Sequence, residues 1–210
     1  MTKLIVALLV ICMIGIDSAM AIEEPTYTVI QQDGKFSLRQ YTDILVAETL
    51  VSGNRQSAGN AAFRPLFRYI SGNNEPNTSI AMTAPVTQQG QKIAMTAPVV
   101  QEQHADRWSV HFVMPREFTL ETLPKPLDPN VTIRQIPART VAVIRYGGRW
   151  TQERYQTHEK ALREWIEKQG FTVAGDPIWA RYNAPFTPSF MRRNEIWIPL
   201  ANQPEENPEP

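Results

Sequence analysis

The sequence has one cysteine, three histidines and no net charge, and each scarcity argues against a class of function. Cys12 lies in the N-terminal apolar run, so the chain beyond that run has neither disulfides nor thiol chemistry. Equal numbers of acidic and basic residues argue against a nucleic-acid partner, which favours a basic surface stripe. The sequence also lacks a Gly-x-Ser-x-Gly elbow, a histidine pair at metal-ligand spacing and a glycine-rich phosphate loop. The common enzyme signatures are therefore absent.

Residues 1–21 have the pattern of a cleavable signal peptide. Lys3 precedes an apolar run from Leu4 to Ile16, and Ala19-Met20-Ala21 offers a cleavage site before Ile22. The run is short for a membrane span, which needs about 20 residues, although a retained anchor is the alternative. Cys12 lacks the small preceding residue of a lipidation site. We expect a periplasmic or secreted protein with no stable membrane insertion after cleavage.

Residues 22–201 are predicted to form the folded domain, and residues 202–210 a disordered tail. A chain of this length can bury an adequate core without disulfides. The tail contains mainly Pro, Glu and Asn and has no large apolar residue, so it cannot contribute to a core.

The folded domain contains a weak internal duplication. When the chain is shifted by 95 residues, Leu38 falls on Ile133, Val46-Ala47 falls on Val141-Ala142, and Gly53 falls on Gly148. Each half predicts two strands, a glycine-containing loop, a helix and further strands. The expected strands are 35–41, 44–51, 107–114, 130–136, 139–146, 177–183 and 194–199. Two such β-α-β-β units can wrap an antiparallel sheet into a distorted barrel with two flanking helices.

Two helices are expected, over about 55–71 and about 152–169. Thr151 is a suitable cap for the second helix, and Gly170 is suited to end it. The first helix carries an apolar stripe but also contains Pro65, which removes a backbone hydrogen bond.

A seven-residue phrase, Ile-Ala-Met-Thr-Ala-Pro-Val, occurs at residues 80–86 and again at residues 93–99. The two copies are joined by a short polar connection that contains Gly90. This arrangement predicts two adjacent antiparallel strands.

The histidines offer few candidate ligands. His104 lies in a polar loop, and strand alternation predicts that His111 faces solvent. His158 lies on the apolar stripe of the second helix, where a hydrogen-bonded structural role is the ordinary interpretation. Its alternative role is as an axial ligand for an iron tetrapyrrole.

A flat apolar ligand that carries carboxylates needs aromatic rings against its plane and guanidinium groups at its acids. The first helix offers Phe63 and Phe67 with Arg64 and Arg68 beside them, and methionines could add adaptable contacts. The alternative is ordinary core with a solvated basic edge. The candidate ligand-binding residues are Phe63, Arg64, Phe67, Arg68, Met82, Met95, Phe190, Met191 and Arg192.

Four motifs in this order resemble the SOUL heme-binding family. They are the doubled Ala-Met-Thr-Ala-Pro-Val, the segments 67–73 and 146–148, and the segment 192–197. The resemblance runs from about Glu24 to Leu200. It implies a monomeric α+β fold like that of bacterial effector-binding modules, and an apolar groove beside the first helix that holds heme or another tetrapyrrole. Phe63, Phe67 and Arg68 fall on groove positions, and the loop from Phe190 to Arg193 lies nearby in the family.

The chain also departs from the family pattern. Animal members carry methionine where this chain has phenylalanine on the first helix, and some carry a basic residue where Asn60 stands. The resemblance does not imply an axial histidine for every member.

Two other functions stay open from the sequence. The first is an effector-binding module for another flat or cationic amphiphile, which a buried, unpaired Glu48 or Glu195 would favour. The second is an enzyme that modifies a porphyrin or removes its metal, with His158 or a glutamate as the base.

Overall fold

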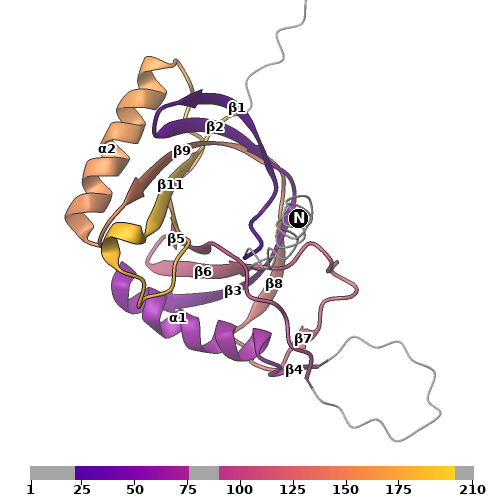
Figure 1. Ribbon diagram of the computed structural model, residues 1–210. Coiled ribbons are helices and arrows are strands. Elements are labelled where there is room, and N and C mark those ends of the chain that lie inside the picture. The colour runs from indigo at the N-terminus through magenta and orange to yellow at the C-terminus, as the bar shows by residue number, and fades with distance from the viewer. Residues whose placement is uncertain (1–21, 76–89, 202–210) are drawn as a thin grey trace, which may run out of the picture.

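The computed structural model describes residues 22–75 and 90–201 (Figure 1). The expected signal peptide, the first copy of the repeated phrase with Met82, and the expected tail all lie outside the described residues.

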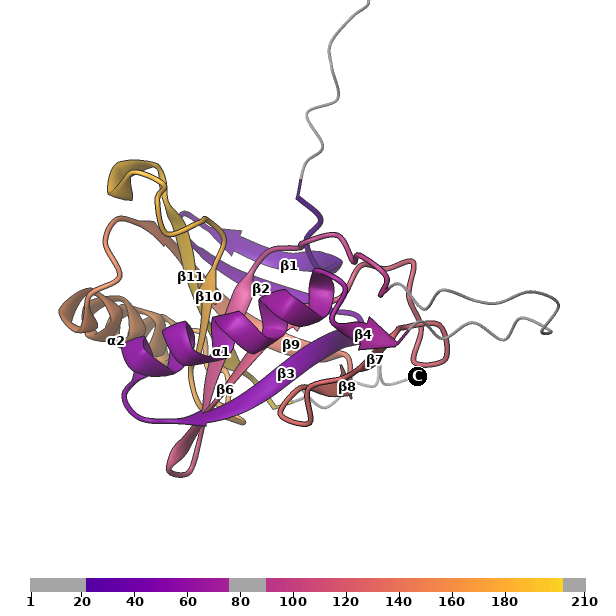
Figure 2. The same cartoon turned by 90° about the horizontal axis from the view of Figure 1, so that it is seen from below.

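The described chain is built on a curled antiparallel sheet of nine strands, in the order β1-β2-β9-β11-β10-β5-β6-β3-β8. The curl produces a partly closed barrel, and both helices pack against its outer surface (Figures 1 and 2). The main strands are β1 (Tyr27–Asp33), β2 (Phe36–Tyr41), β3 (Ile44–Ser52), β5 (Val99–His104), β6 (Arg107–Val113), β8 (Thr132–Ile136), β9 (Arg139–Gly147), β10 (Ile178–Arg181) and β11 (Arg193–Pro199). The remaining elements are α1 (Arg55–Ile70), α2 (Gln152–Lys168), the 3-10 helix η2 (Ser189–Met191) and a small second sheet of β4 (Asn74–Glu75) and β7 (Lys125–Pro126).

The sheet order confirms the predicted duplication. From one side the strands run β2-β9-β11-β10, and from the other β8-β3-β6-β5, so that β2 corresponds to β8 and β3 to β9. Strand β2 does not pair with β3, and β8 does not pair with β9. Instead, β2 pairs with β9 and β3 pairs with β8, so each half contributes a strand to the other.

Two equivalent glycines mark the duplication at single-residue level. Gly53 follows β3 and has a φ of +112°, and Gly148 follows β9 and has a φ of +106°. Side chains rarely tolerate this backbone region, so glycine is the residue that lets each strand turn toward its helix.

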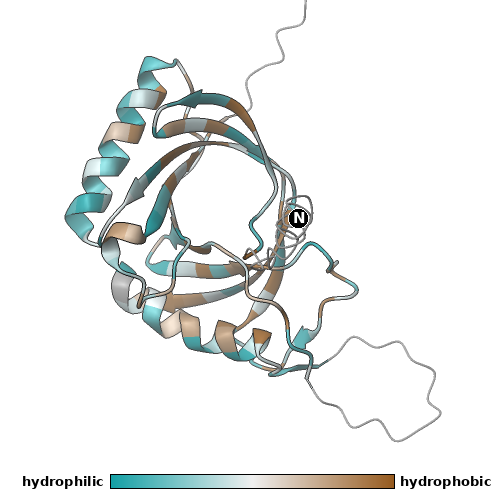
Figure 3. Ribbon diagram, viewed as in Figure 1, coloured by the Kyte–Doolittle hydropathy of each residue, from teal (hydrophilic) through white to brown (hydrophobic). Residues whose placement is uncertain are grey.

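The helices begin where the sequence predicts. The side chains of Asn54 and Thr151 cap α1 and α2 by accepting hydrogen bonds from the backbone N–H groups of Ser57 and Arg154. The outer side of α2 is mostly hydrophilic (Figure 3). Its inner side packs on the sheet through Tyr155, Leu162, Trp165 and Ile166. No helix in the described part of the chain is long and apolar enough to cross a bilayer.

The strand prediction for the second copy of the repeated phrase is wrong for residues 93–98, because β5 begins only at Val99. The backbone N–H of Ile93 donates to the Ile70 carbonyl at the end of α1, at 2.8 Å. The N–H of Ala97 donates to the Glu23 carbonyl at 2.9 Å. The segment therefore joins α1 to the N-terminal residues instead of extending a strand ladder. The sequence analysis also missed β1, whose outward residues are mostly polar.

The prediction that His111 faces solvent is wrong. Its side chain is fully buried, because β6 is covered on both faces: α1 packs outside it and the barrel interior lies inside. His111 lies on the inner face opposite Glu48 of β3. Burial lowers the pKa of His111 to about 4 and outweighs the opposing effects of Glu102 and Glu48.

The packing of α2 on the sheet provides a stability prediction. Leu162 is 0% exposed, so Leu162→Ala should lower the free energy of unfolding by about 2–5 kcal/mol through lost burial and a cavity. Leu127 is 60% exposed, and Leu127→Ala should change it by about 0.5 kcal/mol or less. Chemical denaturation of both variants measures the difference. Equal effects would show that α2 does not pack as described.

The buried imidazole predicts a pH dependence of stability. Below pH 6.5 the unfolded chain protonates His111, while the folded state stays neutral until about pH 4, so acid favours unfolding. The free energy of unfolding should be about 2 kcal/mol lower at pH 5 than at pH 7 from this residue alone. His111→Leu should flatten that slope, and His104→Gln at an exposed histidine should retain it. An unchanged slope in His111→Leu would contradict the burial.

Candidate functional site

The barrel interior contains a buried carboxylate that is bonded on both oxygens. Glu195 on β11 is 0% exposed, and its Oε1 accepts hydrogen bonds from Arg39 at 3.3 Å and from Arg193 at 2.9 and 3.1 Å. Its Oε2 accepts from Arg39 at 3.0 Å and from Tyr182 and Trp197 at 2.8 Å each. The guanidinium of Arg39 lies 4.4 Å from the ring centroid of Tyr27. The carboxylate is therefore held by groups from two strands, β2 and β11, and from the loop after β10.

This bonding fixes the charge of Glu195. Burial alone would raise its pKa, but Arg39 and Arg193 with the Trp197 and Tyr182 hydrogen bonds hold the pKa below its usual value. The second interior carboxylate, Glu48, accepts hydrogen bonds from Ser109 and from Arg134 at 2.8 and 3.2 Å. Both glutamates are paired, so the interior does not present the unpaired carboxylate that a cationic effector would need.

The outer surface carries a different kind of site along α1. Phe63 and Phe67 stack on one another with ring centroids 5.6 Å apart and an angle of 13° between planes. Phe63 also meets the edge of Phe112 on β6, whereas Phe67 is 47% exposed. Met95 is 43% exposed and lies on the segment whose Ile93 packs into the core cluster beneath α1. We call this aromatic surface, Phe63 and Phe67 with the neighbouring segment of Met95, the α1 flank.

The arginines of α1 lie on a different side of the helix. Arg64 and Arg68 are exposed and line a shallow hollow of about 380 Å³ with Leu50, Pro65 and Asp128. Successive helical residues do not face the same direction. The two phenylalanines therefore lie together on one side of α1, and the two arginines lie together on another. The predicted helix already implies this separation, and the structure adds that the phenylalanines are the pair that packs toward Phe112 of the sheet.

His158 lies at a second outer position, on α2. Its ring stacks on Tyr146 with centroids 4.0 Å apart. Burial, with Arg154 and Lys35 nearby, lowers the pKa of His158, which favours a neutral imidazole. A hollow of about 700 Å³, the α2 hollow, adjoins this residue, and its lining includes Arg149, Thr151, Arg154, His158, Ser189 and Phe190.

The loop before β11 therefore belongs to α2 rather than to the α1 flank. Phe190 is 83% exposed and lines the α2 hollow with His158. Met191 is 63% exposed, and the guanidinium of Arg192 lies 4.2 Å from the Trp150 ring centroid and donates to the Thr187 and Pro185 carbonyls at 2.7 Å. The candidate residues from the sequence are thus spread over several surfaces: Phe63, Phe67 and Met95 at the α1 flank, Arg64 and Arg68 at the hollow beside it, Phe190 at the α2 hollow, and Met191 and Arg192 at a cleft on the concave side of the sheet.

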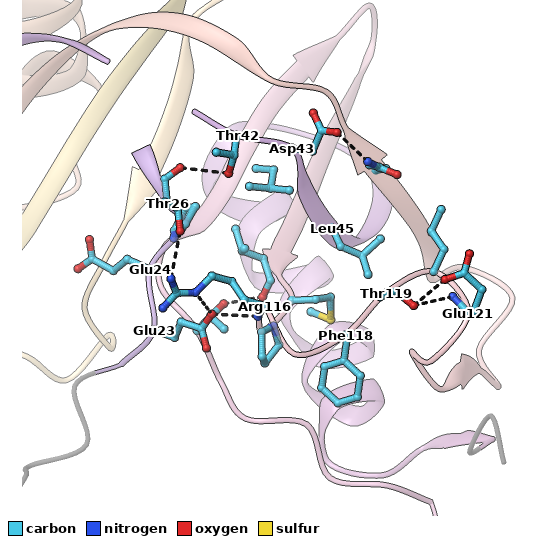
Figure 4. A pocket seen from close by; sticks show the side chains of 18 residues that line it. Glu23, Glu24, Thr26, Thr42, Asp43, Leu45, Arg116, Phe118, Thr119 and Glu121 are labelled. Carbon is cyan, nitrogen blue, oxygen red and sulfur yellow. Dashed lines mark hydrogen bonds and ion pairs between the residues drawn. The ribbon is translucent and has the colours of Figure 1, made fainter. Parts of the chain in front are cut away.

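A smaller hollow of about 330 Å³ opens where β2 ends and β3 begins (Figure 4). Arg116 donates to Glu23 at 3.0 Å and to Thr26 at 3.3 Å across its floor. Asp43 accepts from Gln135 and from the Ala138 backbone. Its polar groups bond mainly to one another, so this hollow makes a weak ligand site.

Sequence analysis missed the interior arginine Arg39 and assigned Arg193 to the loop beside the groove rather than to the interior. The signal was available, because Arg193 and Glu195 are two residues apart on one strand and must share a face. Among the described residues no group of three His, Cys, Asp or Glu side chains is arranged to hold a metal ion.

Curated relatives of this chain are heme-binding proteins. The mouse protein named heme-binding protein 1 is 28% identical over 171 residues, which are 81% of each chain. Human heme-binding protein 2 is 27% identical over 199 residues, which are 91% of this chain and 93% of that one.

Solved structures share the fold at much lower identity. The C-terminal domain of EcmrR has a TM-score of 0.56 at 14% identity, covering 84% of this chain and 98% of that domain. A hydrolase from Listeria innocua has a TM-score of 0.52 at 11% identity, covering 82% and 94%. These similarities establish the effector-binding-like fold and no activity.

The family comparison agrees with the motifs, the duplicated topology and the relatives. The model of the SOUL heme-binding protein family matches residues 22–91 and 87–199, which is nearly all of the described chain. The chain belongs to the SOUL heme-binding protein family.

Proposed function

We propose that this protein binds heme or a related tetrapyrrole reversibly at the α1 flank, as a monomeric carrier rather than as an enzyme. The observation that carries the proposal is the stacked pair of Phe63 and Phe67, with Phe67 about half exposed, in a chain of the SOUL family. A macrocycle that covers Phe67 would remove this apolar surface from water.

The residues of the α1 flank fit the apolar part of such a ligand. Met95 adds an exposed, adaptable thioether from the neighbouring segment, and Arg64 is an exposed cation that follows Phe63 in the helix. Arg64 and Arg68 line the same hollow with Asp128, so both are candidates for a ligand carboxylate. A metal-bound tetrapyrrole would supply any redox or ligand chemistry, and the protein would supply binding and orientation.

The α2 hollow is the alternative position for the same ligand. There a neutral His158 could ligate iron while Phe190 covers the macrocycle, with Arg149 and Arg154 near its acids. We favour the α1 flank because its rings already pack against a buried aromatic, Phe112, whereas Phe190 is almost fully exposed.

A hemin titration followed at the Soret band distinguishes these positions. Phe67→Ala should weaken hemin binding by about threefold to tenfold, since covering the exposed half of a phenylalanine is worth about half of the roughly 1.5–3 kcal/mol for its full burial. Because Phe67 is 47% exposed, its stability cost should be far below that of a core phenylalanine. Leu127→Ala is the matched surface control and should bind hemin as the unchanged protein does.

His158→Ala completes the titration. The spectrum of the bound hemin should be unchanged in this variant if the ligand occupies the α1 flank. Loss of the Soret shift in His158→Ala alone would move the site to the α2 hollow. Absence of saturable binding by the unchanged protein would refute the proposed function. Conversion of hemin to a product would refute a carrier role.

We further propose that the protein acts outside the cytoplasm, on the pattern of residues 1–21. The protein recovered from the periplasm or medium of an expressing bacterium should begin at Ile22, as intact mass measures. Recovery only from the cytoplasm with residues 1–21 attached would contradict export.

A further inference from the structure

The concave face of the sheet holds a cleft that the α1 flank does not touch. The cleft has a volume of about 650 Å³, within the range of small-molecule sites. Side chains from β1, β2, β9 and β11 line it, together with the turn between β1 and β2. Its lining includes Tyr27, Val29, Lys35, Arg39, Arg145 and Arg193. We call it the concave cleft.

The concave cleft is lined by cations, and those at its rim are unpaired among the described residues. Arg39 and Arg193 lie beneath it, Lys35 and Arg145 lie at its exposed rim, and no aspartate or glutamate lines it. The two deep guanidinium groups are balanced by Glu195 and by Glu24, which Arg193 contacts at 2.8 Å. The two rim cations have no carboxylate within salt-bridge distance in residues 22–75 and 90–201. An anion that enters the cleft therefore meets uncompensated positive charge.

The rim is also held in position by the backbone. The N–H of Arg145 donates to the carbonyl of Lys35 at 2.9 Å, so the ends of β9 and of the β1–β2 turn are fixed together. Gly147, two residues further along β9, pairs with Arg193 on β11. Arg145 thus projects from a strand and Lys35 from the turn bonded to it, so the backbones that carry the two cations are fixed relative to one another.

Apolar side chains also line the concave cleft. Val29 is 47% exposed and Met191 is 63% exposed, and the ring of Tyr27 lies over Arg39. Exposed apolar side chains beside cations suit a ligand that has an acid group at one end and a hydrocarbon part at the other.

We propose that the concave cleft is a second ligand site, separate from the α1 flank, which binds an amphipathic organic carboxylate. Lys35 and Arg145 bind the carboxylate, while Tyr27, Val29 and Met191 contact its apolar part. Glu195 neutralises the deep arginines and keeps their side chains ordered beneath the ligand. The site therefore favours an anionic ligand, whereas an unpaired Glu195 carboxylate would favour a cationic one.

Two probes with the same tail and opposite charge test the sign. Calorimetric titration of the purified protein with decanoate should saturate, and titration with decyltrimethylammonium should not. Higher salt should weaken decanoate binding, because the rim cations are exposed. Equal affinity for both probes, or preference for the cation, would overturn the proposal.

Variants of the rim test the position. Lys35→Gln with Arg145→Gln should weaken decanoate binding by at least about tenfold, since both contacts are charge-assisted. Lys160→Gln with Arg107→Gln removes the same charge from exposed positions elsewhere and should leave decanoate binding unchanged. A similar loss of decanoate affinity in both double variants would show that only the net charge of the protein matters, and it would refute the site.

Hemin separates this site from the proposed tetrapyrrole site. The rim double variant should bind hemin as the unchanged protein does, while Phe67→Ala should bind decanoate normally. Weakened hemin binding in the rim variant would mean that the concave cleft belongs to the tetrapyrrole site, which contradicts a separate site. Failure of hemin to bind at all would leave the decanoate result standing on its own.

Discussion

The carboxylate of Glu195 organises the interior of the barrel. It lies on β11 and receives hydrogen bonds from Arg39 on β2 and from Tyr182 beyond β10, so it connects strands that are not neighbours in the sheet. A buried carboxylate without partners would destabilise the fold severely, and the paired arginines would be equally costly without it. The pairing of the interior arginines and the cross-strand hydrogen bonds inside the barrel therefore depend on the same group.

The two faces of the sheet have become chemically different surfaces. The convex face is covered by helices whose contacts are mainly apolar, and at α1 the aromatic packing continues outward from Phe112 through Phe63 to Phe67. The concave face combines paired charges with open cationic side chains such as Arg145. One thin sheet can thus present an apolar surface and a cationic cleft without the two interfering.

Local sequence patterns predicted most of the elements because their signals are local. The cap at Thr151, the apolar stripe ending at Ile166 and the turn glycine Gly148 each report on a few neighbouring residues. The exposure of His111 could not be predicted in this way, since alternation assumes one wet face and β6 has none. Helical geometry alone separates Phe67 from Arg68, but which of them lies nearer the sheet depends on the side of α1 that packs there.

The exchange of strands between the halves has a consequence for how the chain folds. The ladder partner of β2 is β9, and about 100 residues of chain separate them, so loop closure must precede much of the pairing. During synthesis the first half emerges before the strands that complete it. Until then β2 has no β9 along one of its edges, and β3 has no β8 along one of its edges. The native sheet can close only when the last strand has left the ribosome, so the chain remains available to a translocation or chaperone system until synthesis is nearly complete.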